Sequence, residues 1–343
     1  MSGIKIPQLF IIAFLLLMLV MAGLLGIPLG VVVGDSLVRL AMNGVLVLSL
    51  LPMLNAGIGI NFGLPVGICA GLLGMCLAVN WRGCGLIGFV EALLFSMPVA
   101  IVFGTVYSRI LNRVKGREEI AATFVGFSFI PLMNFFWTVA PFRNPAMLWP
   151  IGGKGLRPSI GLKSYFGKAL NDLWAVSLHG LTMPLGLLLF FGLLCLLTHL
   201  FFRTKFGRAM IAVGENETFA LISGVDVRRI RAIAVILSTI IGAWGICVYA
   251  QSYGFIELYD APMVMAFPAA SAVLVGGSMG HRTTVLNVIL GTYLFQTVYI
   301  LSGPLANELL VPEVAEIIRM FISNGIILGA LLHEGTKSSH ATV

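Results

Sequence analysis

Residues 203–231 read RTKFGRAMIAVGENETFALISGVDVRRIR and form a short polar, basic interval between two apolar stretches. Those stretches, near residues 180–202 and 232–250, are each long enough to cross a bilayer, because a spanning helix needs about 20 apolar residues. Inside the interval, Asn216 is a suitable helix N-cap, Glu217 follows in the first turn, and Gly224 suits a left-handed stop. The interval therefore predicts a short polar helix between two membrane spans.

A helix this short is unstable on its own, so it needs anchored ends and a cover for its exposed face. The flanking spans supply the anchors. Phe219 and Ser223, four residues apart, share one side of the predicted helix, and Phe219 is the side chain that a partner's pocket would accept. An ordinary turn between two spans is the alternative interpretation.

The composition places the whole chain in a membrane. Of its 343 residues, 59% are hydrophobic and only 10% are charged, against roughly 25% charged residues in soluble domains. The first apolar run is too long for an ordinary signal peptide and is interpreted as a retained span. The five cysteines lie in or beside apolar stretches, so we expect small core residues rather than disulfides. The prediction is one all-α, polytopic membrane domain over residues 1–343.

Apolar segments with few charges recur along the chain and predict about ten transmembrane helices. They lie near residues 8–30, 40–59, 62–79, 84–108, 120–139, 180–202, 232–250, 261–280, 283–302 and 314–332. Two stretches, 55–67 and 267–280, combine Gly, Pro and small polar residues at membrane depth, where irregular backbone is tolerated only inside protein or beside a water-filled cavity. They are candidates for broken, path-lining helices, one in each half of the chain. Close helix packing through Gly and Ala is the alternative.

Lys and Arg collect on one predicted face, which the positive-inside rule assigns to the cytosol. They lie at Lys5, between residues 109 and 117, and in the interval 203–231. Ten crossings put both termini on this face, and the net charge of +7 then requires no nucleic acid as a partner. The predicted external loop, residues 140–178, is an exception, because it carries five basic residues against a single Asp172. We interpret the flanking spans as setting the orientation of the chain, so that this basic loop lies outside despite the positive-inside rule.

Polar side chains inside spans are costly and are candidates for function. Those expected to line a translocation path are Asn55, Asn61, Glu91, Asn134, Asn287 and Gln296. The amides can donate to and accept from an uncharged solute, but each can equally serve a neighbouring helix. Glu91 is the only carboxylate clearly inside a predicted span, whereas a proton-driven or sodium-driven carrier would need several. The histidines are scattered, so neither a metal site nor a proton relay is predicted, and no catalytic residue is expected.

The polar interval also carries a series of short motifs. They are Phe206-Gly207-Arg208-Ala209, Ala212-Val213-Gly214-Glu215-Asn216, Ala220 and Ser223-Gly224-Val225-Asp226-Val227. This series resembles the cytosolic loop of permease subunits of ATP-binding-cassette (ABC) importers, in particular the branched-chain amino acid and ribose-type family. The similarity extends over about residues 203–300 and includes the later turn Val275-Gly276-Gly277-Ser278.

The resemblance implies an assembly in which two permease subunits form the pathway and an external binding protein delivers the solute. Two separate ATPase subunits would hold ATP and Mg at the cytosolic face, and each permease would insert a coupling helix into an ATPase groove. Carried over by position, that helix is about Glu215 to Ser223. The residues expected at the ATPase contact are Gly214, Glu215, Asn216, Glu217, Phe219, Ala220, Ser223 and Gly224.

The sequence itself is compatible with this division of labour. It contains no G-x-x-x-x-G-K-[ST] phosphate loop, and Gly152-Gly153-Lys154 lacks that spacing, so this chain is expected to bind no cofactor. Under the same resemblance, the basic external loop would offer Arg143, Lys154 and Arg157 to carboxylates of a docking protein. A solvated loop near anionic headgroups is the alternative.

The expected function is therefore import of a small polar solute by alternating access in a bacterial cytoplasmic membrane. The stretch INFGLPVG at residues 60–67 is nearer to amino-acid or nucleoside members, whereas Gly276-Gly277-Ser278 leans towards sugar members. A self-contained secondary transporter or channel is the competing hypothesis. A membrane enzyme is a third, disfavoured because no cluster of His, Cys or carboxylates faces one membrane surface.

Overall fold

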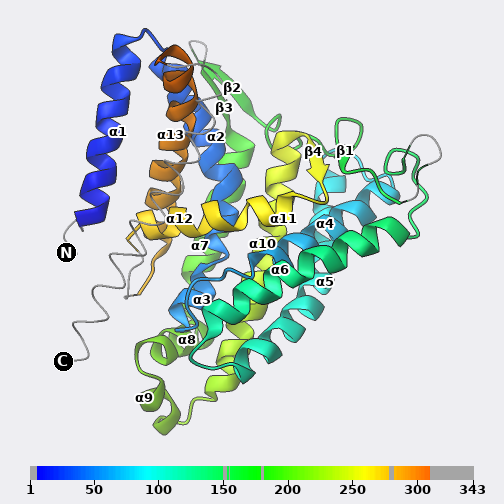
Figure 1. The fold of residues 1–343 in the computed structure, drawn as a ribbon, viewed down its shortest axis with the longest axis vertical. Coiled ribbons are helices and arrows are strands. Elements are labelled where there is room, and N and C mark those ends of the chain that lie inside the picture. The colour runs from blue at the N-terminus through cyan, green and yellow to red at the C-terminus, as the bar shows by residue number, and fades with distance from the viewer. Residues whose placement is uncertain (1–5, 150–152, 154, 179–180, 278–281, 310–343) are drawn as a thin grey trace.

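The computed structural model describes residues 6–149, 153, 155–178, 181–277 and 282–309, and these are mainly helical (Figure 1). The helices are α1 (Ile6–Leu24), α2 (Leu29–Leu48), α3 (Leu51–Asn55), α4 (Leu64–Asn80), α5 (Gly85–Arg113), α6 (Glu118–Val139), α7 (Leu185–Arg203), α8 (Lys205–Glu215), α9 (Glu217–Ile222), α10 (Val227–Tyr253), α11 (Ala261–Val264), α12 (Ala266–Val275) and α13 (Val285–Leu309). The strands are β1 (Ser159–Gly161), β2 (Ala175–Leu178), β3 (Leu181–Pro184) and β4 (Phe255–Glu257).

Six of these helices are long and apolar enough to cross a membrane: α2, α5, α6, α7, α10 and residues 285–305 of α13. Three shorter apolar stretches, in α1, α4 and α11–α12, accompany them. The tenth predicted span, residues 314–332, lies outside the described residues. A bundle of membrane-spanning helices is thus present, while the count of about ten stays a prediction.

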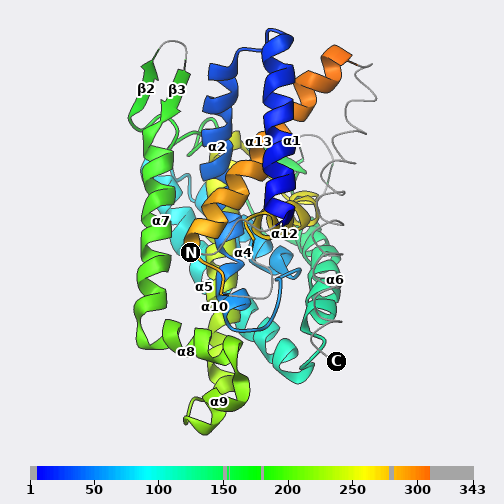
Figure 2. The same ribbon diagram turned by 90° about the vertical axis from the view of Figure 1, so that its left-hand side faces the viewer.

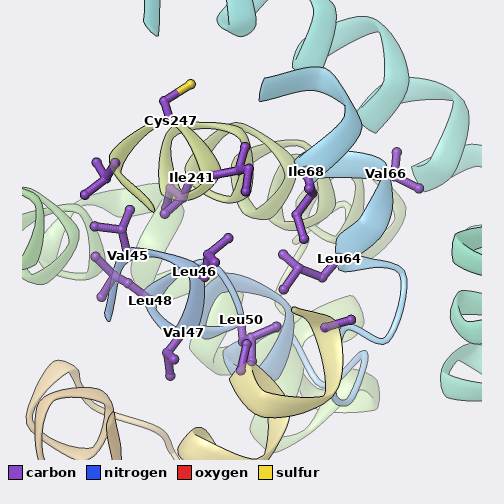
Figure 3. Close-up of a cluster of buried hydrophobic side chains, with 14 of the residues drawn as sticks. Val45, Leu46, Val47, Leu48, Leu50, Leu64, Val66, Ile68, Ile241 and Cys247 are labelled. Carbon is purple, nitrogen blue, oxygen red and sulfur yellow. The ribbon is translucent and has the colours of Figure 1, made fainter. Parts of the chain in front are cut away.

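The core forms where α4, α5 and α10 pack against one another. Nearly every α4 side chain is buried, and its glycines allow this close approach. A Cβ atom on Gly67 would lie 2.9 Å from the carbonyl oxygen of Thr239, and one on Gly71 would lie 2.3 Å from that of Ala243, both on α10. Leu46 of α2 and the α4 residues Leu64 and Ile68 belong to one buried apolar cluster (Figure 3).

The first broken stretch is irregular, as predicted. Between α3 and α4 the backbone turns twice through left-handed glycines, Gly57 at φ 67° and Gly59 at φ 96°. Its polar groups are partly satisfied by α6, where the Glu119 carboxylate accepts from the N–H of Ile60 at 3.0 Å. The second stretch, residues 267–280, is regular over most of its described part, because α12 runs unbroken from Ala266 to Val275 and the break after α11 lies just before it; residues 278–280 lie outside the described part.

The boundary between the first two spans was predicted wrongly. The sequence places it at residues 30–40, but α1 ends at Leu24 and α2 begins at Leu29. This region contains two charged residues, Asp35 and Arg39, which are typical of a loop between spans. In the structure Arg39 is half-buried, and its guanidinium carbon lies 5.7 Å from the ring centre of Tyr299 on α13. A cation–π contact with a distant helix thus accommodates a charge inside a span.

The all-α prediction is corrected at the end of the molecule opposite α9 (Figure 1). There β1 pairs antiparallel with β4, and β2 pairs with β3 in a hairpin that leads into α7. The predicted external loop is therefore folded rather than loose, and Leu156, Ile160 and Phe166 within it are fully buried. Backbone groups buried with these side chains need partners, which the short strands provide.

Candidate functional site

The helix predicted within the polar interval is present as α9, at the end of the molecule opposite the strands (Figures 1 and 2). Asn216 ends α8, where its backbone N–H donates to the carbonyl oxygen of Ala212, and begins α9, where its side-chain Oδ1 accepts from the N–H of Phe219 at 2.9 Å. Gly224 follows α9 with φ 80°, and Asp226 Oδ1 caps α10 by accepting from the N–H of Arg229 at 3.0 Å. The predicted cap and the predicted glycine stop are confirmed, so α8 and α9 form a sharply defined helical hairpin.

The α9 helix exposes apolar side chains that no described residue covers. Phe219 is 65% exposed, Leu221 is 62% exposed and Ile222 is 80% exposed, whereas Ala220 is buried against the rest of the chain. Glu217 pairs with Lys115, at the end of α5. Three large apolar side chains on a helix of six residues make a small contact surface for a partner.

The hairpin also contacts the first broken stretch directly. A Cβ atom on Gly214 of α8 would lie 2.3 Å from the carbonyl oxygen of Asn55, at the end of α3. The Asn55 side chain in turn binds Thr283, donating to its carbonyl oxygen and accepting from its N–H, each at 3.0 Å. A continuous series of contacts therefore connects α8, through α3, to the segment that precedes α13.

Three of the predicted path residues serve neighbouring elements of the bundle. Asn55 binds Thr283 as described. Asn61 donates to Ser238 Oγ at 2.9 Å and accepts from the Tyr107 hydroxyl at 2.8 Å. Asn287 donates to the carbonyl oxygen of Gly276 at 2.6 Å. These amides therefore join helices, which is the alternative that the sequence left open.

The other three predicted path residues lie apart from one another. Glu91 folds back against Gly83, at the turn before α5. Asn134, on α6, has a buried Oδ1 without a hydrogen-bond partner among the described residues. Of these three residues, Gln296 on α13 lines a cavity. The structure thus does not gather the six residues around one path.

The cavity that Gln296 lines has a volume of about 210 Å³. Its wall comes from α2, α10, β4, α11, α12 and α13, and its polar lining residues are Arg39, Asn43, Tyr249, Glu257, Asp260, Gln296 and Tyr299. Among the described residues, Arg39 forms no ion pair with Glu257 or Asp260. Guanidinium donors, carboxylate acceptors and an amide therefore face one space, which suits a small solute with several polar groups.

Sequence reasoning missed most of this cavity. Arg39 was a usable signal, because a charge inside an apolar run is a candidate for function. It was assigned instead to a loop between two spans. Glu257 and Asp260 lie just after a predicted span and were not among the predicted path residues, although β4 and the start of α11 bring them to the wall of this cavity.

The predicted docking residues of the external loop differ in their surroundings. Arg143 has an exposed side chain, while its backbone N–H donates to Asn80 Oδ1 at 3.1 Å. Arg157 is half-buried and donates through Nε to the carbonyl oxygen of Leu148 at 3.0 Å, which holds the loop together. Lys154 lies outside the described residues. Arg143 is therefore the better placed of the described pair to meet an outside partner.

A bundle of apolar helices with an exposed hairpin at one end and a polar cavity inside defines a membrane transport protein. The family model "Branched-chain amino acid transport system / permease component" matches residues 53–331, so the chain belongs to that family of permeases. It is a transport subunit of an ABC importer, and no catalytic activity is indicated for it. The resemblance to this family of permeases is thereby confirmed, while the coupling role of the polar interval stays a prediction.

Curated relatives include permeases of autoinducer 2 import systems. The chain is 27% identical over 268 residues to the autoinducer 2 import system permease protein LsrC of Enterobacter sp. (strain 638), covering 77% of this chain and 68% of the relative. It is 26% identical over 229 residues to the corresponding LsrD protein of Photorhabdus luminescens, covering 66% and 61%. It is 28% identical over 259 residues to LsrC of Escherichia coli O9:H4 (strain HS), covering 75% and 66%. No solved structure matches the chain.

Proposed function

We propose that this chain carries a small polar solute into the cytoplasm by alternating access, driven by ATP that two separate ATPase subunits hydrolyse. A second permease subunit would complete the pathway, and an external binding protein would deliver the solute to the face that bears Arg143. Both termini would then lie in the cytosol. The observation that carries this proposal is the exposed apolar surface of α9, formed by Phe219, Leu221 and Ile222.

The position of α9 supports a coupling role. It lies on the face where basic residues collect, and its hairpin contacts the Asn55–Gly57 turn through Gly214. Movement of an ATPase groove would push on α9, and α8 would transmit that displacement to α3 and to the segment before α13. ATP and Mg would stay on the ATPase subunits.

The polar cavity supports a small, hydrogen-bonding cargo. Curated relatives import autoinducer 2, so that signal is one candidate, and sugars, nucleosides and branched-chain amino acids are the others. Arg39, Gln296 and the two carboxylates at residues 257 and 260 would orient the solute through its polar groups. A fully apolar cargo would leave these groups unpaired and is disfavoured.

Replacing Phe219 with serine tests the docking surface. We expect ATPase subunits to be lost from the purified permease and uptake to fall at least about tenfold, because the variant removes an exposed aromatic anchor of the kind that dominates interfaces. Insertion and folding are expected to be unchanged, because Phe219 is 65% exposed. The measurement is co-purification with the ATPase together with ATP-driven uptake in vesicles.

Phe206 is the matched control for this experiment. It is an aromatic side chain on α8 of the same hairpin and is 52% exposed, but it lies outside α9. Phe206→Ser is expected to retain ATPase binding. Uptake by purified permease without any ATPase, or normal ATPase binding by Phe219→Ser, would contradict the proposal and favour a self-contained carrier.

A second prediction concerns the cavity. Arg39→Gln is expected to raise the half-saturating solute concentration about tenfold to a hundredfold, because hydrogen bonds to a charged group contribute about 1.5–3 kcal/mol. Arg109→Gln is the control, since Arg109 is exposed near the end of α5 and does not line the cavity. Uptake as a function of solute concentration measures both. Equal shifts in the two variants would show that Arg39 acts only through the general charge of the protein.

A further inference from the structure

A second cavity, separate from the polar one, opens at the cytosolic ends of α7 and α13. Its volume is about 340 Å³. It is lined by the end of α7, by Ile211 of α8 and Asn55 of α3, and by the segment that leads into α13. The side chains from α7 are His199, Phe202 and Arg203, and those from the segment before α13 are Arg282, Thr283 and Thr284.

The lining of this cavity is basic. Arg203 and Arg282 bring two basic side chains to it, His199 adds an imidazole, and no Asp or Glu is among the described residues of the wall. Neither arginine forms an ion pair with a described carboxylate. The N-terminus of α13, a helix of 25 residues, also begins at this wall with Val285. Unpaired cations and a helix N-terminus together attract an anion.

Thr283 supplies an independent sign of a ligand. The residue is only 4% exposed, and its Oγ1 is buried without a hydrogen-bond partner among the described residues. The Asn55 amide occupies both its N–H and its carbonyl oxygen, so the residue is held in place while its hydroxyl stays unused. A buried hydroxyl without a partner is costly, and a phosphate oxygen is a suitable acceptor for it.

The approach to the cavity is apolar. Leu196 and Leu200 of α7 are exposed, at 54% and 46%, and they share one face of that helix with His199 and Arg203. This stripe leads from the membrane region to the basic cavity. An acyl chain lying along the two leucines would bring its headgroup to the arginines, whereas free phosphate would make no use of them.

We propose that this cavity binds the phosphate of an anionic phospholipid headgroup from the cytosolic leaflet. Arg203 and Arg282 would contact the phosphate oxygens, the Thr283 hydroxyl would donate to one of them, and the acyl chains would follow Leu196 and Leu200. The lipid would bridge α7 to the start of α13, next to the Asn55–Thr283 contact. It would therefore stabilise the junction between the hairpin and the bundle, independently of which solute is carried.

The test uses the whole permease in nanodiscs of phosphatidylcholine, with or without phosphatidylglycerol. Wild-type protein is expected to retain phosphatidylglycerol through native mass spectrometry and to melt at a higher temperature when that lipid is present. The Arg203→Gln/Arg282→Gln variant is expected to bind it about thirtyfold more weakly, since each arginine that lines the cavity and contacts the phosphate is expected to contribute a factor of about five to the affinity. Arg228→Gln/Arg229→Gln, which removes the same charge from exposed positions on α10, is the control and is expected to bind normally.

Thr283→Val keeps the proposal testable if the arginine variant is unstable. The substitution preserves shape and removes a buried hydroxyl that bonds to nothing described, so stability in phosphatidylcholine is expected to be unchanged or raised while phosphatidylglycerol binding weakens severalfold. Inorganic phosphate is expected to give no thermal shift. A shift with inorganic phosphate equal to that with the lipid, or equal weakening in the Arg228/Arg229 control, would overturn the proposal.

Discussion

Replacing Arg231 with methionine is expected to lower the free energy of unfolding by about 3 kcal/mol, because it leaves the Glu118 carboxylate largely buried and unpaired. Arg231 is 4% exposed, and its Nη2 donates to Glu118 Oε1. Its Nε donates to Asn112 Oδ1 at 3.3 Å. The loss is placed at the lower end of the range for broken buried pairs, because Glu118 lies in the first turn of α6, where the helix dipole stabilises an anion.

The measurement is denaturant unfolding of the detergent-solubilised protein, compared with two further variants. Lys115→Met breaks an ion pair in which the Lys115 side chain is 57% exposed, so a change of only about 0–1 kcal/mol is expected. Arg231→Met combined with Glu118→Leu removes both charges and is expected to recover most of the loss. Wild-type stability in the single variant would show that the Arg231–Glu118 contact does not hold the ends of α6 and α10 together.

Arg231 also shows what sequence reasoning could and could not reach. Its neighbours Arg228 and Arg229 are exposed, as expected of a basic cytosolic loop, and the sequence grouped Arg231 with them. The helix α10 begins at Val227, however, and turns Arg231 inward. Residue type gives the charge of a side chain, but its direction depends on where a helix begins and what packs beside it.

Local features were predicted well because their causes are local. The Asn216 cap and the Gly224 stop depend on residues within one turn, so α9 lies within a residue or two of its predicted bounds. The irregular stretch after α3 was likewise predicted, because Gly57 and Gly59 adopt backbone angles that other residues avoid. Hydrophobic length alone was enough to identify a membrane bundle.

Features that depend on contacts between residues far apart in the sequence were not predicted. The side-chain amides of Asn55, Asn61 and Asn287 can donate and accept hydrogen bonds. Only the fold decides whether their partner is a neighbouring part of the chain or a solute. The polar cavity is lined by residues 39–47 of α2 and by residues between 249 and 299. These two groups lie far apart in the sequence, so no short stretch of sequence reveals the cavity. The sequence does not show that the guanidinium carbon of Arg39 lies 5.7 Å from the ring centre of Tyr299 on α13. Without that contact, a position for Arg39 inside a span could not be predicted.

The contact between α8 and the first broken stretch predicts the second large effect. Gly214→Ala is expected to reduce ATP-driven uptake at least about tenfold and to cost about 1–3 kcal/mol of stability, as overpacking does. The added Cβ would lie 2.3 Å from the carbonyl oxygen of Asn55 and 2.9 Å from the backbone nitrogen of Gly57. Backbone atoms cannot rotate away, so α8 must move off α3 and disturb the Asn55 hydrogen bonds to Thr283.

Gly192→Ala is the matched control, because both substitutions replace a helical glycine with the better helix former. A Cβ on Gly192 of α7 would meet nothing within 4 Å, so a gain of about 0.5–1 kcal/mol or no change is expected there. The exposed apolar side chains of α9 are untouched in Gly214→Ala, so ATPase subunits should still co-purify while uptake is lost. Retained uptake in Gly214→Ala would mean that movement of α9 reaches the bundle by a route other than the Gly214–Asn55 contact.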